Sequence, residues 1–329
     1  MKELLIILDG LMEKEFEENI GETITGEYYN MFTLEKSSYC TEGYVVDSLN
    51  CIMNILGYPP DKYDLSDRAY YEGLSRGLNK YSSIMRCNVV KIKDGILEDF
   101  TGGELPSNIG DLVNNFPISE GKAVSCLGYK NLVYFYNKKL DRGEGLCPPH
   151  FNIGCKIEDI IGNSPDIDNI LKDSMGYFKL KGYKGLGLWP WGVSHKPSFK
   201  KYHRDTGLIC GIDLVHGIGI HLGMDSIKVQ GATGDIDSNI LGKLIETKLS
   251  IEKNNRTILH INGFDESSHR RDLNVKKAFI NRVREQVILP LIKQSISDNI
   301  DIYITIDHRT DSKTGQHERG WVPILKLKL

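Results

Sequence analysis

Strand-like and helix-like stretches alternate along the second half of this 329-residue chain, and this alternation restricts the fold more than any other feature. Apolar residues at helical spacing predict helices at Ile240–Ile251 and Val275–Ile296, and Pro290 should kink or break the second one. Strands that alternate with helices form a mostly parallel sheet with helices on both faces, so we expect an α/β fold. Short apolar runs predict buried strands at Leu208–Ile212, Ser226–Val229, Ile258–Ile261, Ile302–Ile306 and Val322–Leu329. The predicted apolar face of the first helix consists of Ile240, Leu241, Leu244, Ile245 and Leu249.

The strand Ile302–Ile306 runs directly into Asp307-His308, and the chain returns through a polar loop to His317. Core packing does not explain a charged pair at the tip of an apolar strand. Ligands of open α/β sheets bind outside the carboxyl ends of the strands. The stretch therefore predicts three metal ligands, and the alternative is a solvated loop that contains two histidines.

Two other predicted strands end in the same way. Leu4–Leu8 is followed by Asp9, for which the alternative is a simple turn. The strand Ile258–Ile261 is followed by Asp265 and His269, whose i, i+4 spacing puts both side chains on one helical face. A capped helix start with a surface histidine is the alternative there, but it leaves the second Asp and His at a strand tip unexplained.

Ser48 begins a predicted helix in which Leu49, Ile52, Met53 and Leu56 form one buried face. A serine at this position can act as the N-cap of the helix. It can also be a nucleophile, whose phosphorylated form the backbone N–H groups and the helix dipole would stabilise. The residues around Ser48 leave both roles open.

These positions supply seven oxygen and nitrogen ligands, enough for two metal ions with open coordination positions. Carboxylate, imidazole and alkoxide donors without thiolate suit manganese, zinc, magnesium or iron. Paired metals stabilise the attacking and leaving oxygens of phosphoryl transfer. The predicted ligands are Asp9, Ser48, Asp265, His269, Asp307, His308 and His317.

Residues 59–183 differ in character and predict a smaller α+β domain, inserted into a core made of 1–58 and 184–329. Arg68, Arg86 and His150 are its candidate anion-binding residues, with solvated surface or salt-bridge roles as the alternative. Strand-like runs lie at Ile84–Ile92, Ala123–Leu127 and Leu132–Tyr136. Before the insertion, Met31–Lys36 is expected to be a short amphipathic helix.

Composition excludes several classes of partner. The formal net charge is −3, which gives no reason to expect a nucleic-acid partner. No apolar run approaches the roughly 20 residues that a membrane span needs. The seven cysteines are odd in number and contain no CxxC pair, which favours a reducing cytoplasm over a disulfide framework.

Several short motifs follow one another along the chain in a fixed order. They are LDG at 8–10, GLWPWG at 187–192, IDLVHGIG at 212–219, GMDSIKVQGATG at 223–234, HINGFDESSH at 260–269, IDH at 306–308, His317 and VP at 322–323. With these motifs the sequence resembles the archaeal-type cofactor-independent phosphoglycerate mutases, which belong to the alkaline phosphatase superfamily and need no 2,3-bisphosphoglycerate. The resemblance covers most of the chain and is strongest from about residue 185 to 323.

The resemblance implies an alkaline-phosphatase-like fold, two bound divalent metal ions and a reaction that proceeds through a phosphoserine intermediate. It also implies a role in glycolysis. By position, Asp265, His269 and His317 would bind one metal. The other would be bound by the ligand set Asp9, Ser48, Asp307 and His308. Manganese is the first choice, with zinc or magnesium as alternatives. Ser48 would attack the phosphate of 3-phosphoglycerate, and the glycerate would then take the phosphate back on its other hydroxyl to give 2-phosphoglycerate. The inserted domain would bind substrate: Arg86, in MRCN, matches the family's FRCN segment, and Arg68 lies where the family usually has a Gly-Arg pair.

The chain also departs from the family. Leu49 and Ile52 stand where the family has Asp and His, and His195 and His216 stand where it has Lys. The departures keep two alternatives open: a metal-dependent phosphatase or a mutase of another small phosphate or phosphonate, and a non-catalytic relative that binds metal or ligand. We take a phosphomutase acting on a small phosphorylated substrate as the leading hypothesis, with no nucleic-acid or membrane partner.

Overall fold

The computed structural model describes residues 2–28, 31–162, 164–199, 203 and 205–327, and the chain forms two compact units. Unit 1 comprises Met1–Leu65 and Phe199–Leu329, and unit 2 comprises Ser66–Ser198. The sequence-based boundaries, after residues 58 and 183, lie earlier than these. The second boundary differs because the GLWPWG strand pairs with a strand of unit 2 and therefore does not belong to the core.

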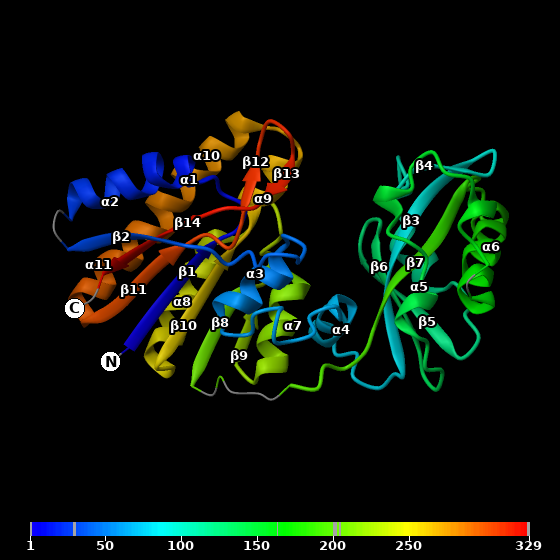
Figure 1. Ribbon diagram of the computed structural model, residues 1–329, viewed down its shortest axis with the longest axis horizontal. Helices are drawn as coiled ribbons and strands as arrows, with labels where there is room; N and C mark the ends of the chain where they lie inside the picture. The colour runs from blue at the N-terminus through cyan, green and yellow to red at the C-terminus, as the bar shows by residue number, and fades with distance from the viewer. Residues whose placement is uncertain (1, 29–30, 163, 200–202, 204, 328–329) are drawn as a thin grey trace. The chain divides into compact units, whose positions relative to one another are not determined.

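Unit 1 is built on a seven-stranded sheet in the order β2-β14-β11-β1-β10-β8-β9 (Figure 1). The five strands β11, β1, β10, β8 and β9 are parallel to one another. At one edge, β14 is antiparallel to β11, and β2 is antiparallel to β14. This arrangement confirms the predicted α/β class with a mostly parallel sheet. The strands of unit 1 are β1 (Lys2–Leu8), β2 (Phe32–Ser37), β8 (Thr206–Cys210), β9 (Asp225–Lys228), β10 (Arg256–Ile261), β11 (Ile300–Thr305), β12 (Arg309–Asp311), β13 (Gln316–Glu318) and β14 (Val322–Leu327).

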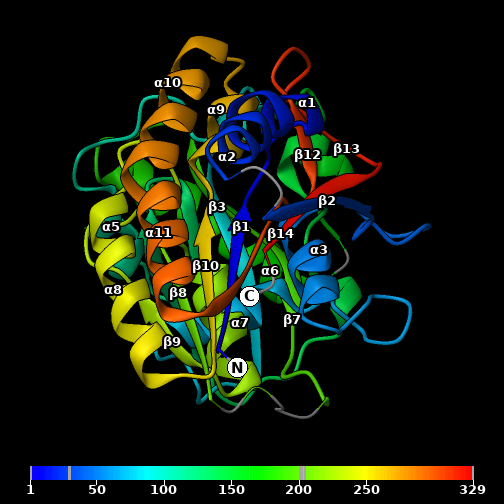
Figure 2. The ribbon, with the colours of Figure 1, turned by 90° about the vertical axis from the view of Figure 1, so that its left-hand side faces the viewer.

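Helices cover both faces of this sheet. Figure 2 shows α8, α10 and α11 on one side of the strands and α3 and α7 on the other. No helix among the described residues is long and apolar enough to cross a membrane. The helices of unit 1 are α1 (Glu13–Phe16), α2 (Glu22–Glu27), α3 (Ser48–Ile55), α7 (Asp213–Leu222), α8 (Ile240–Lys253), α9 (Gly263–His269), α10 (Leu273–Val283) and α11 (Leu289–Asp298), with π-helical turns η1 (Glu17–Gly21) and η5 (Arg284–Ile288).

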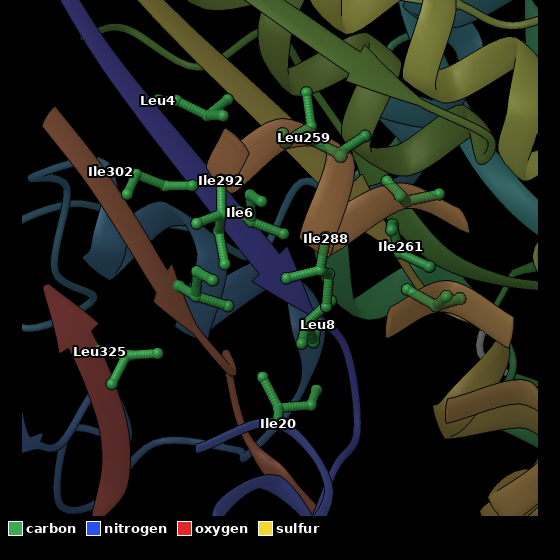
Figure 3. Packing of buried hydrophobic residues seen from close by; sticks show 14 of the residues in the cluster. Leu4, Ile6, Leu8, Ile20, Leu259, Ile261, Ile288, Ile292, Ile302 and Leu325 are labelled. Atoms are coloured by element: carbon green, nitrogen blue, oxygen red, sulfur yellow. The ribbon is translucent and has the colours of Figure 1, made fainter. Parts of the chain in front are cut away.

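The strand β1 lies at the centre of the core. Its alternate residues Leu4, Ile6 and Leu8 are fully buried and pack with Ile302 of β11 and Leu259 of β10 (Figure 3). Burial of each such side chain stabilises the fold by about 1.5–3 kcal/mol. The core therefore fixes the three strands whose ends carry the predicted ligands.

One local prediction is wrong and another is confirmed. The segment expected to be a helix at Met31–Lys36 forms the edge strand β2, because its backbone pairs with β14. The helix predicted at Val275–Ile296 is interrupted as expected near Pro290, where η5 separates α10 from α11. Proline lacks the N–H that a regular helical turn would use, and a π-helical turn absorbs the missing bond.

The predicted apolar face of α8 is confirmed only in part: Ile240 is buried, and Leu244 is partly buried and packs against the core. Leu241, Ile245 and Leu249 are exposed, with relative accessibilities of 52%, 58% and 41%. The helix instead buries a partly polar face that includes Lys243 and Thr247. The buried Nζ of Lys243 donates to the backbone carbonyl of His260 at 2.9 Å, so the polar face is satisfied by hydrogen bonds.

Unit 2 contains an antiparallel five-stranded sheet in which four strands follow the order β4-β3-β6-β5 and β7 also pairs with β3. Its core contains the buried Trp189 of β7. Its elements are α4 (Arg68–Ser75), β3 (Ser83–Lys93), β4 (Ile96–Asp99), α5 (Ile109–Asn114), β5 (Gly121–Leu127), β6 (Lys130–Phe135), the 3-10 turns η2 (Arg142–Glu144), η3 (Pro149–Phe151) and η4 (Ile157–Asp159), α6 (Pro165–Leu180) and β7 (Leu186–Ser194).

Candidate metal centre

The predicted ligands of unit 1 meet at one edge of its sheet. The strands β11, β1 and β10 are parallel neighbours, so their carboxyl ends lie side by side. Asp9 follows β1, and Asp307-His308 follows β11. Asp265 lies on α9, which begins shortly after β10. His317 returns on β13, which pairs with β12 immediately beyond His308.

Four residues form a first group. The Oγ of Ser48 lies 3.2 Å from Nε2 of His308 and 3.5 Å from Oδ2 of Asp9. The same Nε2 lies 3.4 Å from Oδ1 of Asp9 and 3.4 Å from Oδ2 of Asp307. Asp9, Asp307 and His308 are almost completely buried. Side chains from three separate segments thus converge on one point.

Three residues form a second group. The Oδ2 of Asp265 lies 3.2 Å from Nε2 of His269, and its Oδ1 lies 3.4 Å from Nε2 of His317. The two imidazoles contact backbone carbonyls through their other nitrogens, His269 with Gly315 at 2.8 Å and His317 with Val46 at 2.7 Å. Each Nδ1–H is therefore the donor to its carbonyl, which directs both Nε2 atoms toward Asp265.

The donor atoms fit bound metal. Ligands about 2.1 Å from one ion lie about 3.0–3.4 Å from each other, and the donor separations in both groups fall close to this range. In addition, Oδ1 of Asp9 and both carboxylate oxygens of Asp307 are buried without a hydrogen-bond partner among the described residues. Asp9, Asp307 and His308, and likewise Asp265, His308 and His317, each offer donor atoms within 4.8 Å of one another. His308 therefore lies between the two groups.

Electrostatics favour a cation in the first group. Burial raises the pKa of Asp307 to about 8 and lowers the pKa of His308 to about 3. Burial also raises the pKa of Asp9 well above its ordinary value, and repulsion from Asp307 and Asp265 raises it further. Ionising both carboxylates is therefore unfavourable without a counter-charge. A bound cation would supply that charge and lower both pKa values.

The second group behaves differently. Burial alone would raise the pKa of Asp265, but hydrogen bonds from His269 and His317 outweigh it and hold that pKa well below the ordinary value. The hydrogen bond to Asp265 in turn raises the pKa of His269 to about 9. Asp265 is thus ionised. A cation bound there would replace the two protons that the Nε2 atoms of His269 and His317 donate to its carboxylate.

Supporting residues around the ligands were not predicted from the sequence. Thr310 donates its hydroxyl to Oδ1 of Asp265 at 2.7 Å and lies 3.3 Å from Nδ1 of His308, whose proton it can accept. His260 is fully buried, with Nε2 3.2 Å from Oδ2 of Asp9. The signal for His260 was available: an imidazole inside an apolar strand needs a polar partner.

Lys276 connects the segments that carry the ligands. Its fully buried Nζ forms an ion pair with Glu15 at 2.6 Å and donates to the carbonyl of Gly10 at 3.2 Å. It also donates to Oγ of Ser312 at 3.3 Å. The sequence signal was a lysine on the buried stripe of an amphipathic helix.

Gly10 allows β1 and α9 to approach closely. Its φ is +81°, and a Cβ there would lie 2.6 Å from both Cα and Cβ of Asp265. Real Cβ contacts are not this short, so only glycine fits between the two ligands Asp9 and Asp265.

The N-cap of α3 is Asp47 and not Ser48. The carboxylate of Asp47 accepts from the backbone N–H of Asn50 at 2.9 Å, and Ser48 is the first helical residue. The alternative role of Ser48 as a helix cap is therefore wrong. Its hydroxyl is directed to Asp9 and His308.

The three candidate anion-binding residues gather in unit 2. Arg68 and Arg86 both contact Glu72, at 3.0 and 3.4 Å. The guanidinium of Arg86 also lies over the ring of Trp191, 4.4 Å from its centroid. The ring of His150 lies 5.8 Å from that of Trp191. Burial and the nearby charge of Arg86 lower the pKa of His150.

The positions that depart from the family pattern have structural partners. The backbone N–H of His195 donates to Asp67 at 2.8 Å. Nδ1 of His216 lies 2.9 Å from Oγ of Ser226. Leu49 and Ile52 are buried on α3.

Comparison with known proteins assigns the chain to a class. The model of the Metalloenzyme superfamily matches residues 82–328, and the chain belongs to that superfamily. Use of a metal is therefore a property of the family, and the donor set described above fits it.

Within that class, the chain is similar to 2,3-bisphosphoglycerate-independent phosphoglycerate mutases. The enzyme of Methanosarcina barkeri is 28% identical over 297 residues, which span 82% of this chain and 74% of the relative. That of Methanothrix thermoacetophila is 27% identical, with 98% and 90% covered. These matches confirm the predicted resemblance to a phosphoglycerate mutase-like isomerase.

Solved structures share the fold. The PH0037 protein from Pyrococcus horikoshii matches with a TM-score of 0.75 and 20% identity, covering 99% of this chain and 87% of its own. The cofactor-independent phosphoglycerate mutase from Thermoplasma acidophilum matches with a TM-score of 0.59 and 18% identity, covering 100% and 90%.

Proposed function

We propose that this chain is a phosphomutase with a dinuclear metal centre, and that it interconverts 3-phosphoglycerate and 2-phosphoglycerate through phosphoserine at Ser48. The observation that carries the proposal is the environment of the Ser48 hydroxyl, which contacts Asp9 and His308 while Asp47 caps the helix. A serine needed only for helix stability would not have this arrangement.

Asp9, Ser48, Asp307 and His308 would hold one divalent ion, and the second group described above would hold the other. We propose manganese first, with zinc or magnesium as alternatives, because all donors are oxygen or imidazole nitrogen. Such ions neutralise phosphoryl oxygens and lower the pKa of a bound serine hydroxyl.

The protein residues then perform the transfer. Oγ of Ser48 forms a bond to phosphorus while the ester bond to the glycerate oxygen breaks, and that oxygen takes up a proton. The phosphoserine lies at the start of α3, where the helix dipole stabilises negative charge. The second hydroxyl of the glycerate then attacks phosphorus, and the Ser48 hydroxyl is restored.

We propose Arg68, Arg86 and His150 as substrate-binding residues. Two guanidinium groups can bind carboxylate or phosphate in bidentate fashion. Glu72 contacts both, which orients them while no anion is bound. Arg86→Lys keeps the charge but loses the planar fork, so KM should rise with little change in metal content.

A second candidate function is a metal-dependent phosphatase. Leu49 and Ile52 bring apolar side chains to the first turns of the helix that begins at Ser48. No side chain at these two positions can exchange a proton with a returning hydroxyl, which favours water as the acceptor.

One experiment tests these functions together. Purified protein is analysed for metal and assayed with 3-phosphoglycerate, with 2-phosphoglycerate and free phosphate measured in parallel. Ser48→Ala should fold, retain metal and lose roughly a thousandfold or more in turnover. Mass spectrometry of wild type with substrate should find phosphate on Ser48. Isomerised product supports the mutase, and phosphate release without isomerisation supports the phosphatase. Unchanged turnover in Ser48→Ala refutes both.

A further inference from the structure

Two thiols face each other beside Ser48. The Sγ atoms of Cys40 and Cys51 lie 3.7 Å apart, and neither cysteine forms a disulfide. Cys51 is fully buried on α3, one turn after Ser48. Cys40 is partly exposed and lies at the start of the loop that leads into α3. One thiol is therefore accessible from solvent and the other is held behind it.

The loop between these cysteines contacts the metal centre. The carbonyl of Val46 accepts from Nδ1 of His317 at 2.7 Å. The guanidinium of Arg319 donates to the carbonyls of Thr41, at 2.5 Å, and of Tyr44, so the loop is held at several points. The segment between the two cysteines thus contacts His317 of one ligand group and includes Ser48 of the other.

The environment of Cys40 favours its thiolate. A hydrogen bond from Cys51 lowers the pKa of Cys40 to about 7, against the opposing effect of burial, and the charges of Arg319 and Arg309 contribute. The thiolate is the reactive form of cysteine. A partly exposed thiolate next to a second thiol is the arrangement of redox-sensing cysteines.

We propose that Cys40 and Cys51 form a peroxide-sensitive dithiol that closes to a disulfide across the loop leading to Ser48. The Cys40 thiolate attacks one oxygen of hydrogen peroxide, the O–O bond breaks, and hydroxide leaves as water after it takes up a proton. Cys51 sulfur then attacks the sulfenic acid at Cys40. The S–S bond forms, the S–O bond breaks, and a second water leaves with the thiol proton. Two thiols are oxidised and one peroxide is reduced to two waters.

The modification would act on the catalytic segment directly. A bond between residues 40 and 51 restrains both ends of the loop, which includes Val46 and Ser48. Reduction by a small dithiol restores the open form.

The test uses the reduced full-length protein and graded hydrogen peroxide, followed by alkylation and mass spectrometry. Tryptic peptide 37–62 contains both cysteines, so disulfide formation lowers its mass by two hydrogens. A second cleavage after Glu42 then gives two fragments that remain linked by the disulfide. The exposed Cys147 and Cys155 are internal controls. At pH 7, Cys40 should be oxidised about threefold faster than an ordinary exposed thiol, since more thiolate outweighs its lower nucleophilicity.

Cys51→Ser removes the second thiol with little change in volume. In this variant Cys40 should accumulate as sulfenic acid, which a 1,3-diketone probe traps, and no loss of two hydrogens should occur in peptide 37–62. Equal oxidation rates of Cys40, Cys147 and Cys155 in the wild-type protein would overturn the proposal. So would oxidation of Cys40 to higher acids without a bond to Cys51. Both results come from the wild type and do not depend on folding of the variant.

Discussion

Replacing Lys276 with methionine should destabilise unit 1 severely, although the substitution preserves side-chain volume. The ammonium group of Lys276 is fully buried, and it contacts Glu15 at 2.6 Å and the carbonyl of Gly10 at 3.2 Å. Methionine fills the same space but leaves both acceptors without their donor.

The expected magnitude follows from the broken pair. Removing one partner of a buried ion pair costs about 3–5 kcal/mol. The side chain of Glu15 is 16% exposed, and its carboxylate also accepts from the backbone N–H of Met12 at 3.0 Å, so the lower end of this range applies. We expect a loss of about 3 kcal/mol in the free energy of unfolding. For a unit of this size each kcal/mol lowers the melting temperature by about 2–4 °C, giving a decrease of roughly 6–12 °C.

Thermal denaturation followed by circular dichroism measures this decrease, and Lys277→Met is the matched control. Lys277 lies next to Lys276 on α10 but is exposed, so its replacement should change the melting temperature by no more than about 1–2 °C. Glu15→Gln combined with Lys276→Met should be less destabilised than Lys276→Met alone, because the unpaired charge is gone. Equal melting temperatures for the two lysine variants would refute the reasoning.

Three further predictions concern the ligands. Gly10→Ala should lower the free energy of unfolding by roughly 2–4 kcal/mol and weaken metal binding, because the added Cβ would collide with Asp265. Gly57 also has a positive φ but has open space around it, so Gly57→Ala should lower the free energy of unfolding by only about 1 kcal/mol. Equal losses for the two variants in urea denaturation would contradict this reasoning. Asp47→Ala should remove the cap of α3 and cost about 1 kcal/mol in the same assay, more than Ser48→Ala. The metal affinity of metal-free protein, measured by titration calorimetry, should fall as the pH is lowered from about 8, because burial raises the pKa of Asp307 to about 8 and the metal must then displace a proton. An affinity that increases toward acid pH would exclude this competition.

The meeting of the ligands at one sheet edge could be predicted from the sequence because strand tips are easy to locate. The apolar runs before Asp9 and Asp307 end abruptly, and parallel strands bring their carboxyl ends to one edge. The distinction between Asp47 and Ser48 could not be made, because both residue types cap helices equally well. The extended backbone of Asp47 and the hydrogen bond that its carboxylate accepts from Asn50 identify it as the cap.

The apolar pattern of the sequence did not predict that α8 buries a lysine. The apolar residues of α8 suggested one face, but the helix buries Lys243 because a carbonyl on β10 accepts its proton. Such a partner is distant in sequence and leaves no local periodic signal. The same holds for β7, which joins unit 2 through long-range pairing with β3.

The position of β1 in the sheet affects how the chain can fold during synthesis. Glu3 pairs with Arg256 and Lys2 pairs with Ile300, so during synthesis β1 emerges from the ribosome well before its two neighbours in the sheet, β10 and β11. At about 5–20 residues per second, this delay is roughly 10–50 s. Throughout it, the apolar run KELLIIL has two unpaired strand edges of the kind that associate with other chains. We therefore expect that a chaperone bound to this segment would protect the nascent polypeptide from association with other chains.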